Sequence, residues 1–223
     1  SRVSLDGRLL DRHWARGMDA PKGMAILGDR LYVADIDTLV EIQLPRGSIL
    51  NRYPAPEAEF LNDVAVHQGS GTVYVSDMFG DAVYRLRDGE FDRWLHGPEL
   101  AAPNGLHAEP GRLVYGSWGQ RTEGFATTAV GHLKTVDLDT GAIGDLGDGR
   151  PVGNMDGVEA DGSGGYFASD WVAGAVFRVQ ADGSFEQLLD LPQGSADIEY
   201  IPQHGLLLVP QMMDGRVDAY RTR

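Results

Sequence analysis

The sequence predicts an all-β protein, a β-propeller built from four-stranded antiparallel blades. Three observations support this prediction. A short phrase with a variable, mostly polar residue recurs five times in the 223 residues, and short apolar runs bounded by Gly and Asp follow each copy. No window shows a sustained period of 3.6 residues. A repeat of roughly 40 to 45 residues with four short strands is the unit of a propeller blade.

The recurring phrase marks the predicted first strand of each blade. The five copies occupy residues 20–25, 60–65, 102–107, 154–159 and 195–199. The residues at the equivalent position are spaced by 40, 42, 52 and 40 residues, and they are Lys22, Asn62, Asn104, Asp156 and Ala196. The longest repeat holds a polar, Gly-rich insertion at 119–128, which we expect to form a loop after the second strand.

The remaining strands of each blade follow the phrase in a fixed order. β-branched and aromatic runs joined by Gly-containing turns indicate hairpins. Fourth strands follow a Gly turn, as at 88–91 and 182–185. The predicted second strands lie at 31–35, 73–77, 113–117, 166–170 and 206–210, and the predicted third strands at 39–42, 82–86, 133–136, 175–179 and 217–220.

The two ends of the sequence leave the number of blades open. Residues 2–14 resemble the third and fourth strands at 83–94, whereas the last repeat has only three strands. Either the N-terminal strands complete a closed five-bladed ring, or they are the outer strands of an incomplete first blade in a six-bladed architecture. We favour the second alternative. The whole chain is then one domain, with a partial blade at 1–20 and blades at 21–60, 61–102, 103–154, 155–194 and 195–223.

Composition excludes several classes of partner. The net charge of −14 and the absence of a basic stripe argue against nucleic acid and against an anionic membrane surface. The absence of cysteine removes disulfides and thiolate chemistry. No apolar run is long enough for a transmembrane helix. We expect a soluble protein that binds a small molecule, with a monomer favoured. It would be cytoplasmic, or periplasmic or secreted after removal of an N-terminal segment.

The equivalent polar residues of the phrase predict a site at one mouth of the central channel. The second strand of a blade runs antiparallel to the first, so the start of the first and the end of the second open on the same face. Two amides and a carboxylate, from Asn62, Asn104 and Asp156, would converge there, and their oxygens suit Ca²⁺, Mg²⁺ or Mn²⁺ better than a soft metal. Such residues can instead cap local turns. The repeated Asp35, Asp77 and Asp170 are expected to accept backbone N–H groups.

The phrases containing Asn62, Asn104 and Asp156, in this order and spacing, resemble those of the six-bladed senescence marker protein/gluconolactonase/regucalcin family. The resemblance extends over essentially the whole chain. It implies one divalent cation (Ca, Mn, Mg or Zn) at the channel mouth and hydrolysis of lactones or related esters. It also implies that Asn104 and Asp156 are metal ligands, with Asn62 close to metal and substrate. The family's glutamate ligand would precede Ser1, and Phe60 stands where the family often has a polar residue.

The sequence therefore predicts a metal-dependent lactonase or esterase. Asp156 would activate water as a base, and the bound cation would polarise the ester carbonyl. Lys22 would hold an anionic substrate or stabilise the developing oxyanion, or would instead pair with Asp35. Trp118 could form a wall of the pocket. The alternative is a non-catalytic propeller that binds a small molecule or a peptide at the same mouth.

Overall fold

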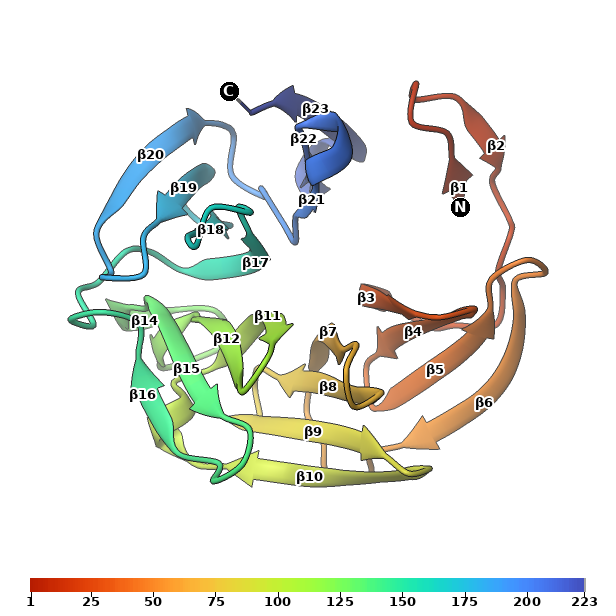
Figure 1. Ribbon diagram of the computed structural model, residues 1–223, viewed down its shortest axis with the longest axis horizontal. Helices are drawn as coiled ribbons and strands as arrows, with labels where there is room; N and C mark the ends of the chain where they lie inside the picture. The colour runs from red at the N-terminus through yellow and green to blue at the C-terminus, as the bar shows by residue number, and fades with distance from the viewer. Residues whose placement is uncertain (223) are drawn as a thin grey trace.

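The computed structural model describes residues 1–222, whose five largest β-sheets are arranged around a common axis as the blades of a β-propeller (Figure 1). The sheets are antiparallel, and in each four-stranded sheet the strands pair in the same order from the axis outward. The first blade contains β3 (Pro21–Leu27), β4 (Arg30–Asp35), β5 (Thr38–Gln43) and β6 (Ser48–Pro54). The second contains β7 (Leu61–His67), β8 (Thr72–Asp77), β9 (Ala82–Arg87) and β10 (Glu90–His96).

The next three blades repeat this arrangement. The third contains β11 (Pro103–Glu109), β12 (Arg112–Ser117), β15 (Leu133–Asp137) and β16 (Ile143–Asp145). The fourth contains β17 (Met155–Ala160), β18 (Tyr166–Asp170), β19 (Ala175–Val179) and β20 (Phe185–Asp190). The fifth has three strands, β21 (Glu199–Ile201), β22 (Leu206–Gln211) and β23 (Arg216–Arg221). The second and third strands predicted from the sequence are therefore confirmed in all five blades. Arg223, the last residue of the predicted fifth blade, lies outside the described residues.

The N-terminal residues form a separate two-stranded sheet. β1 (Arg2–Val3) pairs with β2 (Leu9–Asp11), and neither strand joins another sheet among residues 1–222. Figure 1 shows this pair on the side of the ring between β23 and the first blade. The segment that follows β2 packs Trp14, Ala15 and Met18 against the first blade. The strand pair predicted at the N-terminus is thus present.

The insertion in the third blade is more ordered than the expected loop. It follows the second strand β12, as predicted, but it forms a hairpin of β13 (Gly119–Arg121) and β14 (Thr127–Val130). Gly119 has a positive φ of 112°, and a Cβ there would meet the Ala129 carbonyl oxygen at 2.3 Å. A glycine therefore allows the two strands of this hairpin to approach closely.

The hydrophobic core lies between neighbouring blades. Tyr32 and Leu39 of the first blade pack with Val64 and Tyr84 of the second. Corresponding clusters join the second blade to the third, the third to the fourth and the fourth to the fifth. The second, third and fourth sheets are consequently covered on both faces, which explains why their second and third strands read as nearly continuous apolar runs. In the fifth sheet β22 alternates between buried and half-buried residues, and β23 is largely exposed. The helices among residues 1–222 are three-residue 3₁₀ turns, η1 (Pro98–Leu100), η2 (Pro202–His204) and η3 (Met212–Asp214), and none could cross a membrane.

Candidate functional site

A bulge recurs in the first strand of every four-stranded blade and carries the variable residue of the phrase. The pairing of β3 with β4 is interrupted between Pro21 and Met24. Equivalent interruptions follow Leu61, Pro103 and Met155 in β7, β11 and β17. Bulged residues leave the regular ladder, and their side chains are re-aimed. The bulges therefore present the four residues that the sequence singled out, Lys22, Asn62, Asn104 and Asp156.

The bulges lie at the same end of the ring as the ends of the second strands. The residue before each bulge pairs with the last residue of the second strand, as in Pro21 with Asp35 and Leu61 with Asp77. Pro103 and Met155 pair with Ser117 and Asp170 in the same way. This register confirms that the phrase residues and the ends of the second strands share one face of the ring. We call this face the mouth.

Asn62, Asn104 and Asp156 come together at the mouth as a hydrogen-bonded row. The Asn62 amide donates to Oδ1 of Asn104, and Asn104 is hydrogen-bonded to the Asp156 carboxyl. Nδ2 of Asn104 also donates to the Met155 carbonyl oxygen at 3.2 Å. Asn104 is 1% exposed, whereas Asn62 and Asp156 are half-buried. The row thus joins three successive blades, and its two ends, Asn62 and Asp156, remain partly exposed.

The electrostatic environment of Asp156 favours its protonated form. Burial raises the pKa of this carboxyl to about 8, and the negative charges of Asp197 and Asp170 act in the same direction. The hydrogen bond from Asn104 lowers the pKa, but its effect is smaller. A carboxylate with such a pKa is a stronger base than an ordinary aspartate. A cation close to Asp156 would favour its ionised form.

A second pair of carboxyls, Asp63 and Asp197, lies beside this row. They hydrogen-bond to each other, and Oδ2 of Asp63 accepts the backbone N–H of Leu106 at 2.7 Å. Burial, reinforced by Asp197, raises the pKa of Asp63 well above its ordinary value. Burial and the charge of Glu159 raise the pKa of Asp197 to about 7. The sequence analysis did not single out this pair, although both residues occupy the same phrase position, one residue after Asn62 and after Ala196.

The aspartates at the ends of the second strands have the structural role that was predicted for them. Asp35 accepts the backbone N–H groups of residues 19 and 20, at distances from 2.6 to 3.0 Å. Asp77 accepts those of residues 59, 60 and 80. Asp170 accepts those of residues 172 and 173, both at 2.9 Å. Each carboxylate fixes loop segments that border the mouth.

Lys22 lies at the mouth but outside the hydrogen-bonded row. Its Nζ donates to the Ala20 carbonyl oxygen at 3.0 Å and lies 4.5 Å from the centre of the Phe60 ring. Burial lowers the pKa of Lys22, and the charge of Asp35 partly opposes this effect. Within residues 1–222 no ion pair joins Lys22 to Asp35, whose oxygens are occupied by backbone N–H groups. The side chain therefore keeps hydrogen-bonding capacity for a ligand.

Trp118 belongs to a group of aromatic side chains at the mouth, which we call the mouth aromatic cluster. Trp118 is 2% exposed, and its Nε1 donates to the Phe125 carbonyl oxygen at 3.0 Å. Trp118 therefore packs beneath the exposed members of the cluster and offers little surface of its own to a ligand. The members are Phe60, Phe79, Trp118, Phe125 and Trp171, which pack in pairs with ring centres 4.6 to 6.5 Å apart.

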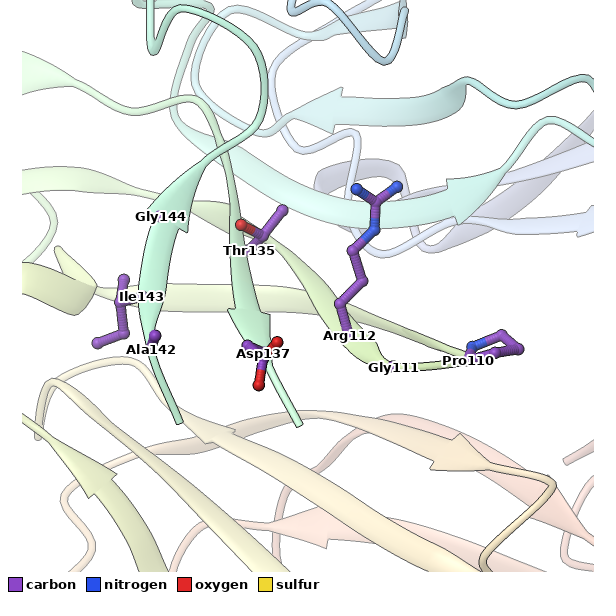
Figure 2. A pocket seen from close by; sticks show the side chains of 8 residues that line it. All are labelled: Pro110, Gly111, Arg112, Thr135, Asp137, Ala142, Ile143 and Gly144. Carbon is purple, nitrogen blue, oxygen red and sulfur yellow. The ribbon is translucent and has the colours of Figure 1, made fainter. Parts of the chain in front are cut away.

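Two shallow hollows lie away from this site. One, of about 460 Å³, lies beside the third blade and is lined by Pro110, Arg112, Thr135, Asp137 and Ile143, among others (Figure 2). In Figure 2 the Arg112 side chain points away from Asp137, and its guanidinium hydrogen-bonds to Tyr166 of the fourth blade at 2.9 Å. The other, of about 400 Å³, lies near the turns at 67–69 and 107–110. These turns are at the ends of β7 and β11 far from the mouth, so neither hollow is our candidate site.

Comparisons with known proteins agree with the fold. No protein-family model and no curated protein matches the sequence. A catalytically inactive virginiamycin B lyase from Staphylococcus aureus with quinupristin is 11% identical, with a TM-score of 0.69 over 99% of this chain and 72% of that one. A nidogen/laminin complex is 15% identical, with a TM-score of 0.68 over 91% and 80% of the two chains. A gluconolactonase from Xanthomonas campestris is 19% identical, with a TM-score of 0.65 over 86% and 69%.

These similarities identify the chain as a β-propeller whose structural neighbours include enzymes. The gluconolactonase belongs to the class suggested by the phrases around Asn62, Asn104 and Asp156. The lyase and the nidogen complex show that the same fold serves other functions. At these identities the comparisons support the architecture alone, and the function has to be argued from the mouth.

Proposed function

We propose that this chain is a hydrolase that cleaves a lactone or a related ester at the mouth of the ring with the help of one divalent cation. The observation that carries the proposal is the row formed by Asn62, Asn104 and Asp156. Three polar side chains from successive blades meet beside the axis, where small apolar residues would pack without needing polar partners. The likeness in fold to a gluconolactonase adds support.

The donor set of the row fits a hard divalent cation. Asn62 offers an amide oxygen, and the Asn104 oxygen, which accepts the Asn62 amide, has a second lone pair. Asp156 offers a carboxylate that has no positively charged partner within hydrogen-bonding distance among residues 1–222. Oxygen ligands of this kind suit Ca²⁺, Mg²⁺ or Mn²⁺, with Zn²⁺ a poorer match. In the described part of the chain no three Asp, Glu or His side chains gather to bind a metal. Water and substrate would therefore have to complete the coordination.

Asp156 is the proposed base of the reaction. A bound cation would polarise the ester carbonyl as a Lewis acid. The Asp156 carboxylate would take a proton from a water molecule as the water oxygen forms a bond to the carbonyl carbon. When the bond to the leaving oxygen breaks, Asp156 would return the proton to that oxygen. The products are a carboxylic acid and an alcohol, which remain in one molecule when the substrate is a lactone.

The other predicted residues are assigned to binding. Asn62 would orient the substrate through its amide, and Lys22 would hold an anionic group through the Nζ hydrogens that Ala20 leaves free. Trp118 would act as the floor of the aromatic cluster, because it is buried and fixed by its hydrogen bond to Phe125. In this proposal Lys22 and the aromatic cluster bind the substrate, while Asp156 carries out the chemistry.

Thermal unfolding with added cations tests the proposed metal site. We expect Ca²⁺, Mg²⁺ or Mn²⁺ to raise the melting temperature of the wild-type protein and to have no such effect on the Asp156→Asn variant. A matched control is Asp190→Asn, an exposed carboxylate on β20, which should keep the full response. Turnover of a panel of lactones and aryl esters should also depend on Asp156. Absence of any cation response in the wild type would contradict the metal-dependent proposal.

The mouth aromatic cluster favours a second function, a non-catalytic propeller that binds a small molecule or peptide at the same place. Phe125 is 52% exposed and offers an apolar surface that can bind a ligand without chemistry. Saturable binding without turnover of any lactone or ester would support this alternative. Turnover that disappears in Asp156→Asn would exclude it.

A further inference from the structure

We propose that the mouth selects a substrate with a flat hydrophobic ring and a nearby negative charge, and that it discriminates against polyhydroxylated sugar lactones. The inference rests on the proposed hydrolase function for the reacting group, an ester or a lactone. It concerns the part of the substrate that does not react. Three features of the mouth carry it: an exposed aromatic surface, exposed apolar side chains next to that surface, and a lysine that has no ion pair among residues 1–222.

The aromatic surface lies next to the polar row. Phe60 and Phe79 are stacked, with ring centres 4.6 Å apart, and Phe125 packs edge-on against Phe79 at 5.2 Å. The Asn62 amide nitrogen lies 3.8 Å from the sulfur of Met78, a buried residue in the group against which Phe60 and Phe79 pack. A ring bound on the cluster would therefore place an attached ester beside the row. Aromatic pairs of this kind prefer offset or edge-on contacts, which a flat ligand can extend.

The hairpin of β13 and β14 holds Phe125 in place. The Arg121 guanidinium donates to the carbonyl oxygens of Gly124 at 2.8 Å and Phe79 at 2.9 Å. The Trp118 indole donates to the carbonyl oxygen of Phe125 itself. These hydrogen bonds fix the backbone that carries the exposed phenyl ring, so this segment loses little conformational freedom when a ligand binds to it. This hairpin is the insertion that distinguishes the third repeat from the others.

The loops that follow the second strands also expose apolar side chains at the mouth, beside the polar side chains of the hairpin at 120–123. The exposed residues that follow the second strands of the third, fourth and fifth blades include Phe125, Val172, Met212 and Met213, which are 52%, 43%, 66% and 67% exposed. Methionine side chains adapt their shape to hydrophobic ligands. A polyhydroxylated substrate lying over these apolar side chains would lose hydration without gaining hydrogen bonds from them.

The negative charge is inferred from Lys22. The chain has two lysines, and the other, Lys134, is paired with Asp145 at 2.7 Å. Lys22 has no ion pair among residues 1–222 and lies over the ring of Phe60, at the edge of the cluster. A protein with a net charge of −14 repels anions at long range, so an anionic ligand requires a local positive group of this kind. Lys22 and the cluster thus define one amphipathic binding surface.

Calorimetric titration with unreactive ligands tests the inference without relying on turnover. Naphthaleneacetate carries both the ring and the charge, naphthaleneethanol carries only the ring, and gluconate carries the charge on a polyhydroxylated chain. We expect naphthaleneacetate to bind most tightly, and gluconate to bind at least about tenfold more weakly. Gluconate binding as tightly as naphthaleneacetate would overturn the inference.

Substitutions at the exposed face of the cluster locate the binding surface. Phe125→Ala should weaken naphthaleneacetate binding by about tenfold or more, whereas Phe185→Ala, which removes an exposed phenyl ring on β20, should leave it unchanged. Lys22→Met should weaken binding of naphthaleneacetate but not of naphthaleneethanol. Unchanged affinity in both Phe125→Ala and Lys22→Met would refute the proposed surface. Thermal melts of each variant would establish that it is folded.

Turnover assays separate this inference from the proposed hydrolase function. If the ligands bind as expected but no ester or lactone is hydrolysed, the hydrolase proposal fails and the ligand class stands. If gluconolactone is hydrolysed as efficiently as an aryl ester by an Asp156-dependent reaction, the hydrolase proposal stands and the ligand class fails. A lower KM for anionic aryl esters that is lost in Phe125→Ala would support both.

Discussion

The buried pair of Asp63 and Asp197 predicts that the stability of this protein falls as the pH rises. The pair shares a hydrogen bond that requires at least one proton, and burial together with Glu159 raises the pKa of Asp197 from 3.8 to about 7. Below pH 3.8 the carboxyl is protonated in both the folded and the unfolded chain, so it adds no cost. As the pH rises towards 7 the unfolded chain loses the proton first, and folding becomes less favourable.

The size of this effect follows from the distance between the two pKa values. Each pH unit between 3.8 and about 7 costs about 1.4 kcal/mol of unfolding free energy, so the cost reaches about 4 kcal/mol near neutral pH. Asp197→Asn should remove most of it. The hydrogen bond between the two carboxyls raises the pKa of Asp63 and lowers that of Asp197, so Asp63 holds the shared proton and donates it. The oxygen of an asparagine at position 197 can accept this hydrogen bond and the Ile198 N–H that Asp197 accepts now. The variant should therefore match the wild type at acidic pH and exceed it at neutral pH.

Urea denaturation followed by tryptophan fluorescence would measure this difference at about pH 4, 6 and 8. The gap in unfolding free energy between Asp197→Asn and the wild type should widen with pH, by up to about 4 kcal/mol. Asp190→Asn, at an exposed position, controls for the loss of one negative charge. A gap of constant size at all three pH values would refute the argument that Asp197 is held protonated by burial.

Three further predictions concern structural contacts, two of them at the mouth and the third at the opposite face of the ring. Gly105→Ala should destabilise the protein by about 1–3 kcal/mol or more in chemical denaturation, because the added Cβ would lie 1.9 Å from a carbonyl oxygen of the next blade. The control Gly69→Ala should be nearly neutral, because its Cβ would meet only a flexible side chain at 3.3 Å. Asp77→Ala leaves three backbone N–H groups without their acceptor and should lower stability by about 2–4 kcal/mol in the same assay. Tyr166→Phe should cost about 1–2 kcal/mol, and a double-mutant cycle with Glu109→Gln, whose carboxylate accepts the tyrosine hydroxyl at 3.0 Å, should show coupling.

The architecture could be predicted from the sequence because each repeat contains the same order of short apolar runs and turn residues. Runs such as 73–77 and 82–86 are apolar, short and bounded by turn residues, and they became β8 and β9. The phrase also predicted that Asn62, Asn104 and Asp156 would meet, because equivalent positions in a ring of blades face a common axis. Their proximity is a consequence of symmetry and did not depend on the details of packing.

The features that escaped prediction depend on contacts between distant segments. The insertion at 119–128 is polar and Gly-rich, which is typical of a loop, but Arg121 and Trp118 pair with carbonyl oxygens and stabilise a hairpin. Asp63 was not singled out beside Asn62, because its burial and its contact with Asp197 both depend on packing between blades. A charged side chain within a predicted strand is a signal of a buried acidic site. The spacing of residues along the sequence does not show which other side chain will contact it.

The acidity of the whole protein makes it necessary to distinguish a cation at the row from cations attracted to the surface. A net charge of −14 concentrates any divalent ion near the protein, and this diffuse attraction is screened by salt within a Debye length of about 8 Å at physiological ionic strength. A site made of Asn62, Asn104 and Asp156 would instead saturate, and its stabilisation would grow with the logarithm of the cation concentration above Kd. A melting-temperature increase that persists in physiological salt and is lost in Asp156→Asn, but not in Asp190→Asn, can come only from the row. An increase that disappears with added salt in all three proteins would assign the cation to the surface and leave the mouth without its metal.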